Sequence, residues 1–74
     1  MFELLSVDDL VRIAHAGGGF RIESSLKITN DLVRIAHAAS QNGARIVMTG
    51  LKLRSVEDLI MIAHAGKGSV FFED

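Results

Sequence analysis

The octapeptide DLVRIAHA occupies Asp9–Ala16 and recurs unchanged at Asp31–Ala38, and a close variant, DLIMIAHA, occupies Asp58–Ala65. A residue suited to capping precedes each copy, and a Gly-containing turn and a short β-prone segment follow it. The chain therefore divides into three similar units, at residues 6–24, 28–49 and 55–73. Because repeats of this length usually stack as supersecondary modules, we expect residues 1–74 to form a single α/β domain built by internal repetition.

Each octapeptide predicts an amphipathic helix. In the first copy, one stripe of a 3.6-residue period is formed by Leu10, Ile13, Ala14 and Gly17. Ser6 and Ser55 stand three residues before an Asp, which is the spacing of a capping box. Thr29 or Asn30 is expected to cap the middle helix. Glycines follow each pattern and favour helix ends there, so the predicted helices cover residues 6–16, 29–41 and 55–65.

The segments that follow the helices predict strands. Apolar and charged residues alternate in Phe20–Glu23, which indicates one buried face and one solvated face. Two more strands are expected at residues 45–49 and 69–73, and a fourth is possible at residues 2–4. Ile46 and Met48 are assigned to the buried face of the middle strand, and Val70 and Phe72 to that of the last one.

Strand–helix–strand units of this length favour parallel strands joined by right-handed crossovers. The alternating strands predict a sheet that is covered on one face, because strands buried on both faces are apolar throughout. We therefore expect a parallel sheet of three or four strands with all helices on one face. This geometry is solenoid-like and analogous to that of leucine-rich repeat proteins, although their consensus of Asn and spaced Leu is absent. The alternative fold is a sheet with shuffled strand order and helices on both faces.

Composition narrows the classes of partner. The chain has no Cys, which excludes disulfides and thiolate metal sites. Its formal net charge of −1 offers no general attraction to nucleic acids or anionic membranes. The N-terminal segment does not resemble a signal peptide, and no apolar run approaches the ~20 residues of a transmembrane helix. We expect a cytoplasmic protein with neither a nucleic-acid partner nor a membrane partner.

The candidate chemical groups have structural explanations. His15, His37 and His64 occupy the same position in each unit, so stacked helices would carry them side by side, whereas a zinc site needs converging ligands. The sequence GKGS at residues 66–69 closes a helix, whereas a phosphate-binding loop opens one. Adjacent acidic residues at the helix starts serve as caps. We therefore predict no catalytic residue, no metal and no cofactor.

An anion site is the alternative hypothesis for function. In parallel α/β units, the helix N-termini gather beyond the carboxyl ends of the strands, where ligands commonly bind. The loops at that edge carry Lys27, Lys52 and Arg54. Helix N-termini attract anions, although acidic residues in the first turns already use that field. These three cationic residues are the predicted anion-binding set.

The third unit departs from the other two, and this departure predicts a partner surface. Ile60 and Met61 stand where the first two helices have Val and Arg, and Phe71 stands where the first strand has Arg21. Exposed apolar residues gathered in one terminal unit favour coverage by a partner. The leading hypothesis is a non-enzymatic interaction or scaffold module that forms a homodimer through Ile60, Met61 and Phe71.

Overall fold

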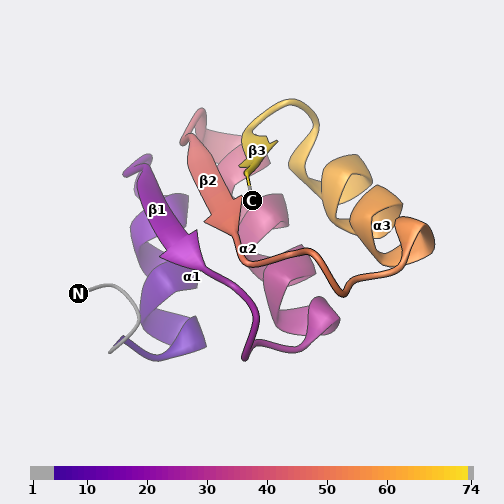
Figure 1. Ribbon diagram of the computed structural model, residues 1–74. Helices are drawn as coiled ribbons and strands as arrows, with labels where there is room; N and C mark the ends of the chain where they lie inside the picture. The colour runs from indigo at the N-terminus through magenta and orange to yellow at the C-terminus, as the bar shows by residue number, and fades with distance from the viewer. Residues whose placement is uncertain (1–4, 74) are drawn as a thin grey trace.

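The computed structural model describes residues 5–73 of the chain. Helices and strands alternate in the order α1 (Val7–His15), β1 (Phe20–Glu23), α2 (Thr29–Asn42), β2 (Ile46–Thr49), α3 (Val56–Gly66) and β3 (Val70–Phe72) (Figure 1). The possible strand at residues 2–4 lies outside the described part of the chain. The longest helix, α2, has 14 residues, and none of the three helices has both the length and the apolar character needed to cross a bilayer.

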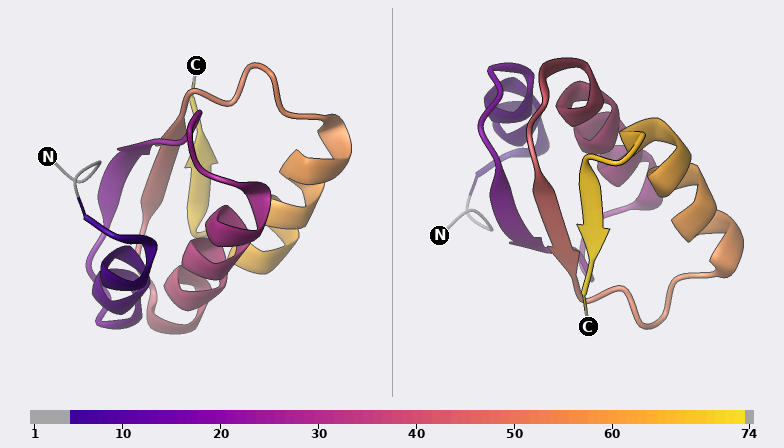
Figure 2. Two further views of the ribbon diagram at one scale, coloured as in Figure 1. Left: turned by 90° about the horizontal axis from the view of Figure 1, so that it is seen from below. Right: turned by 90° about the horizontal axis from the view of Figure 1, so that it is seen from above.

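The three strands form a parallel sheet in the order β1-β2-β3. Phe20 is aligned with Ile46, and Ile46 with Val70, so neighbouring units are in register. All three helices lie on the same side of this sheet (Figure 2). The predicted small α/β domain with a parallel sheet is therefore confirmed. The alternative with shuffled strands and helices on both faces is wrong, because each helix returns the chain to the adjacent strand.

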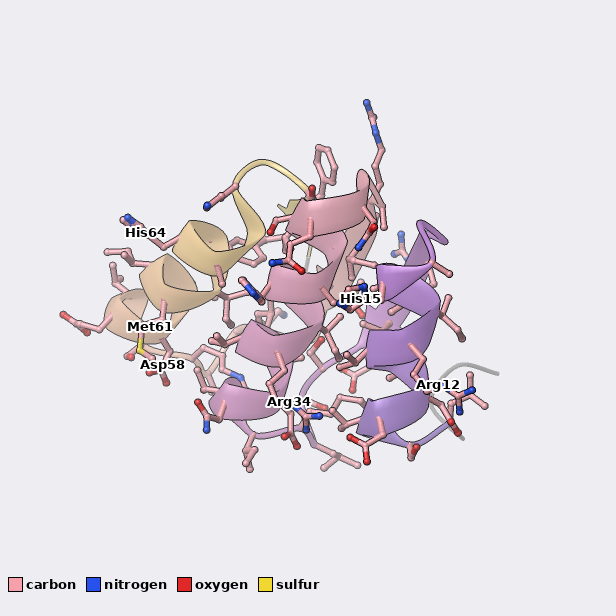
Figure 3. All side chains as sticks on the ribbon, turned by 180° about the vertical axis from the view of Figure 1, so that it is seen from behind. Arg12, His15, Arg34, Asp58, Met61 and His64 are labelled. Atoms are coloured by element: carbon pink, nitrogen blue, oxygen red, sulfur yellow. The ribbon has the colours of Figure 1, made fainter. Side chains whose placement is uncertain are left out.

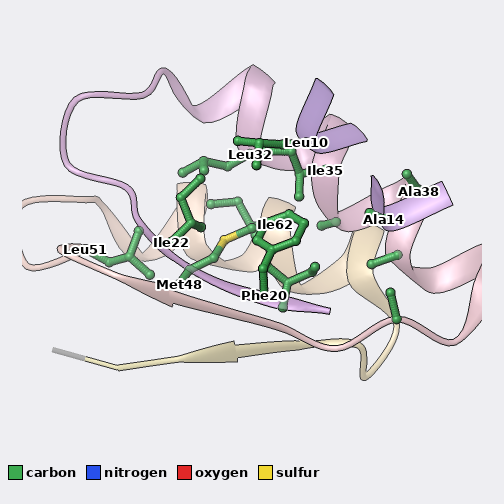
Figure 4. Close-up of a cluster of buried hydrophobic side chains, with 14 residues drawn as sticks. Leu10, Ala14, Phe20, Ile22, Leu32, Ile35, Ala38, Met48, Leu51 and Ile62 are labelled. Carbon is green, nitrogen blue, oxygen red and sulfur yellow. The ribbon is translucent and has the colours of Figure 1, made fainter. Parts of the chain in front are cut away.

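The hydrophobic core lies between the sheet and the helical layer (Figure 4). Its largest apolar side chains are fully buried and come from every element except β3: Leu10, Ile22, Leu32, Ile35, Ile46, Met48 and Ile62. Burying each such side chain contributes ~1.5–3 kcal/mol to the free energy of folding. The alternation predicted for β1 and β2 is confirmed, since Ile22, Ile46 and Met48 face the helices.

All three helices start within one residue of the predicted positions, but the capping residue was predicted correctly at only two of them. The Ser6 and Ser55 hydroxyls accept hydrogen bonds from the backbone N–H groups of Asp9 and Asp58, each at 3.1 Å. The middle helix differs, because its N-cap is Ile28 and no side chain caps it. The prediction that Thr29 or Asn30 caps this helix was therefore wrong. Thr29 already lies within the helix, and its hydroxyl is hydrogen-bonded to the side chains of Arg54 and Asp58 instead.

The third unit is packed more loosely than the sequence pattern indicates. Phe72 was expected to be buried but is 41% exposed, and Val70 is only partly buried. Leu59 is partly buried and Ala63 is exposed, although both belong to the apolar stripe of α3. Helices pack ~8–10 Å apart whereas strands lie ~4.8 Å apart. On a one-sided sheet, α3 is therefore displaced outward beyond β3, as Figure 1 shows.

Two helix ends allow backbone strain to be tested, because one substitution should lower the free energy of unfolding and the other should raise it. Gly43 ends α2 with a φ of 72°, and an added Cβ would meet no atom within 4 Å. Lys67 ends α3 in the same left-handed region, with a φ of 48°. We expect Gly43→Ala to lower the free energy of unfolding by about 1 kcal/mol, because only glycine adopts this conformation without strain. Lys67→Gly should raise it by about 0.5 kcal/mol, since the added freedom of the unfolded chain offsets part of the gain.

Urea denaturation followed by far-UV circular dichroism measures both changes. Ala16→Gly is a matched control for Lys67→Gly, because Ala16 ends α1 with a right-handed φ of −80°. Glycine relieves no strain at that position, so this variant should be less stable than the wild type. Equal unfolding midpoints for the wild type and the Gly43→Ala protein would contradict the assignment of strain to the end of α2.

Candidate functional site

The outer side of α3 carries the first candidate surface, which is apolar. Val56, Ile60 and Met61 are 66%, 57% and 49% exposed, respectively. We call these three residues the α3 patch. Two of them, Ile60 and Met61, were predicted from the sequence. Val56 was not, although it is also apolar and lies one turn before Ile60.

The ion pair that joins α1 to α2 has no counterpart between α2 and α3, where Met61 stands in place of the Arg. Arg12, Arg34 and Met61 occupy equivalent positions on successive helices and lie on the outer side of the helical layer (Figure 3). The Arg34 Nη2 lies 2.8 Å from the Asp8 carboxylate of α1. Between α2 and α3, the corresponding residues are Met61 and Asn30, which form no ion pair. The contact between α2 and α3 therefore lacks the electrostatic link that joins α1 to α2.

Phe71 lies away from the α3 patch. It is aligned with Arg21 and Val47 on the face of the sheet opposite the helices. The Arg45 guanidinium lies 5.8 Å from the centre of the Phe71 ring, a cation–π contact. The structure thus brings Ile60 and Met61 together on α3 and places Phe71 on the other side of the molecule.

A second candidate surface lies where the carboxyl ends of β1 and β2 lead into the next helices. An open hollow of about 890 Å³ lies between the loops at residues 24–29 and 50–54, and Lys27, Lys52 and Arg54 all line it. Its rim is apolar as well as cationic, because Leu26 and Leu53 are 96% and 101% exposed. The predicted cationic residues are thus gathered at one site.

The apolar part of this hollow was not predicted. The signal was present in the sequence, because both loops contain a Leu-Lys pair followed by a β-branched or aliphatic residue. These tripeptides are Leu26-Lys27-Ile28 and Leu51-Lys52-Leu53. Loops of this kind are normally polar, so two exposed leucines beside two lysines indicate an amphipathic surface.

Arg54 acts as a clamp between the two loops. Its Nη1 donates to the Thr29 hydroxyl at 2.7 Å. Its Nη2 donates to the Ser24 carbonyl oxygen at 2.7 Å and also to the carbonyl oxygen of Lys27. The Thr29 hydroxyl in turn donates to the Asp58 carboxylate at 3.2 Å. Arg54 is therefore largely committed to the protein itself, whereas Lys27 and Lys52 form no ion pair within residues 5–73.

The histidines do not converge. The His15 Nδ1 lies 3.1 Å from the Asn42 side-chain nitrogen, and the His37 Nε2 lies 3.2 Å from that of Gln41. His15 and His64 lie on different helices of the outer layer, well apart in Figure 3. Within residues 5–73, no group of three or more His, Asp or Glu side chains is arranged to hold a metal ion.

The comparisons with known proteins give no match: the sequence fits no family model, and neither a curated protein nor a solved structure resembles it significantly.

The clamp can be tested by removing it. We expect Arg54→Ala to lower the free energy of unfolding by about 2 kcal/mol, because the carbonyl groups of Ser24 and Lys27 lose a charged donor. Arg54→Lys should recover little of this loss, because a single ammonium group cannot reproduce the planar fork of donors. Urea denaturation provides the measurement.

Lys52→Ala is the control for the clamp, since it removes a cation from the same hollow without breaking a hydrogen bond. It should leave the unfolding midpoint within error of the wild type. If Arg54→Ala also leaves the midpoint unchanged, Arg54 is not a clamp and its guanidinium is free to bind an anion.

Proposed function

We propose that this protein is a non-enzymatic interaction module that self-associates through its C-terminal unit. The observation that carries the proposal is the α3 patch, in which Val56, Ile60 and Met61 are exposed side by side on the last helix. Isolated exposed apolar residues are ordinary, but a group on one terminal helix is typical of a surface that a partner covers.

We also propose that the three units are true structural repeats, stacked as in a short solenoid. The same octapeptide supports this, because its two identical copies lie in α1 and α2 and its variant lies in α3. In such a stack, each helix is covered by the next one, and within residues 5–73 no further helix covers α3. Self-association supplies the missing cover.

An interface of standard size would cover a sizeable part of the surface of this small chain. Its described surface is 4526 Å², and a standard interface buries ~800 Å² on each partner. Burial of the aliphatic groups in the α3 patch supplies a few kcal/mol, at ~25 cal/mol per Å² of apolar area. This gain alone does not offset the cost of association, so the interface must also bury surface around the α3 patch, and we expect a weak complex with a dissociation constant no tighter than micromolar.

The proposal includes no catalytic step. One member of each adjacent acidic pair is engaged in a structural contact, Asp8 with Arg34 and Asp58 with Thr29. The acidic residues of the first turns also stabilise the helix N-termini. The role assigned to this surface is adhesion between protein chains.

Sedimentation velocity across a range of concentrations tests the proposal. The wild type should show a weight-average mass that rises above that of the monomer in the micromolar range. Ile60→Lys should abolish this rise, because a charged group cannot be buried against an apolar partner. Met61→Arg should weaken it to a smaller extent, since Met61 is the least exposed residue of the α3 patch.

Leu26→Lys is the matched control, because Leu26 is an exposed apolar residue that lies outside the α3 patch. Association of this variant should equal that of the wild type. A wild-type protein that remains monomeric up to millimolar concentration would contradict the proposal.

The loop hollow supports a second candidate function, the binding of an amphipathic anion. Lys27 and Lys52 provide positive charge, and Leu26, Ile28 and Leu53 provide apolar area beside it. An acid with a short hydrocarbon chain satisfies both features, whereas inorganic phosphate satisfies only the first. Arg54 contributes by holding the two loops together.

Titration of the ¹⁵N-labelled protein with decanoate, below its micelle concentration, tests this candidate by NMR. Amide shifts should be confined to residues 24–29 and 50–54, and Lys52→Ala and Leu53→Ser should each weaken binding. Phosphate alone should cause much smaller shifts. The absence of loop shifts with either compound would remove the hypothesis.

A further inference from the structure

The contact between α1 and α2 supplies a template for a contact between two molecules. On α1, Asp8 and His15 contact α2 through Arg34 and Asn42. Val11 lies between them on the same side of the helix, and Val7 and Val11 are both partly buried. We call the side of a helix that faces its successor the trailing side, which on α1 consists of Val7, Asp8, Val11 and His15.

The trailing side of α3 repeats this arrangement, and no helix within residues 5–73 covers it. The equivalent residues are Val56, Glu57, Ile60 and His64, which have the same spacing and the same chemistry. Val56 and Ile60 are exposed, whereas their counterparts on α1 are partly buried. Glu57 occupies the position of Asp8, yet within residues 5–73 it forms no ion pair.

The opposite side of α1 repeats the side of α2 that receives this contact. On α2, Arg34 makes this contact, and Asp31, Ile35 and Ala38 lie on the same side of the helix. We call these four residues the receiving side, and α1 carries the identical set: Asp9, Arg12, Ile13 and Ala16. An open hollow of about 410 Å³ lies beside these four residues and Leu5. The receiving side of α1 is therefore both identical in sequence to that of α2 and partly concave.

The charged groups on the two helices make the correspondence specific. Arg34 lies 3.9 Å from its own helix partner Asp31 and 2.8 Å from Asp8 of the preceding helix. Arg12 lies 3.8 Å from its own helix partner Asp9 and has no second carboxylate within residues 5–73, so its side chain is 83% exposed. Arg12 thus has a carboxylate partner on its own helix, as Arg34 does, but lacks the second partner that Asp8 of the preceding helix gives Arg34. Glu57, at the position equivalent to Asp8, is the carboxylate that would fill this place.

From this correspondence we propose that copies of the chain associate head to tail, with the trailing side of α3 on one copy packed against the receiving side of α1 on the next. Ile60 and Val56 enter the hollow beside Ile13 and Ala16, and Arg12 pairs with Glu57. This inference rests on the proposed function and identifies the surface that covers Val56 and Ile60 of the α3 patch. Because the two surfaces differ, the contact is heterologous and extends into an open chain or a ring of copies instead of closing as a twofold dimer.

The apolar residues give this contact its affinity, and the ion pair gives it its direction. An exposed ion pair contributes little to stability, whereas complementary charges fix orientation and exclude wrong pairings. The contact should be weaker than the internal one, because α1 has 9 residues and α2 has 14. The last turn of α2, where Asn42 contacts His15, has no equivalent on α1.

Complementation between two blocked variants tests the proposal. Ile60→Lys blocks the α3 surface, and Ala16→Arg blocks the receiving side of α1, where the equivalent residue of α2, Ala38, is almost fully buried. Each variant alone should be monomeric in sedimentation velocity. An equimolar mixture should form a dimer and nothing larger, because one intact surface remains on each partner. Circular dichroism confirms that both variants are folded.

Charge exchange provides a second test that does not depend on a bulky substitution. Arg12→Glu and Glu57→Arg should each weaken association about tenfold, because each places like charges on the two sides of the contact. An equimolar mixture of the two variants should regain wild-type association, since each variant then meets the opposite charge on its neighbour. The double variant should regain it alone, because it exchanges both charges at every contact. Failure of both combinations to recover would overturn the pairing of Arg12 with Glu57.

Three outcomes separate this inference from the proposed function. A wild-type protein that is monomeric at all concentrations overturns both. Association that stops at the dimer, with Ile60→Lys disruptive and Ala16→Arg harmless, overturns the head-to-tail contact and retains the C-terminal surface. Growth beyond the dimer, together with rescue in the mixture of blocked variants, supports the head-to-tail contact.

Discussion

The difference in spacing between strands and helices governs this molecule. Parallel strands lie ~4.8 Å apart and packed helices ~8–10 Å apart. When all helices lie on one side of a sheet, they therefore cannot all stay aligned with their strands. In this chain the mismatch appears at the C-terminal end. The α3 helix lies beyond β3, and side chains that the stripe would bury, such as Leu59 and Ala63, stay partly or fully accessible.

Both candidate surfaces result from this arrangement. The α3 patch is exposed because, within residues 5–73, α3 packs against a helix on one side only. The loop hollow exists because the connections from β1 and β2 must span outward from the sheet to the more widely spaced helices, which leaves Leu26 and Leu53 without cover. A domain with helices on both faces would not have either feature in this form.

The sequence allowed most of the fold to be predicted, because the repeated octapeptide combines helical period, caps and stops. Leu10, Leu32 and Ile62 are buried as the period requires, and Ser6 and Ser55 cap as their spacing to Asp indicates.

The errors concern contacts between units. Thr29 looks like a cap, but its hydroxyl is bonded to Arg54, in the loop before α3, and to Asp58 of α3. The candidate sites were less predictable for the same reason, because periodicity assigns a residue to a face of its own element but does not show how far one element is displaced from another. Phe72 illustrates this limit, since its assigned face was correct and its burial was not.

The Arg54 clamp has a consequence for how the chain unfolds. Stacks of similar units tend to lose their ends one at a time, because each unit depends mainly on the adjacent one. Here a single guanidinium from the loop before α3 holds the loop before α2, and Thr29 passes the connection on to Asp58. The second and third units therefore cannot open separately without breaking the same bonds, and this favours all-or-none melting over fraying from the C-terminal end.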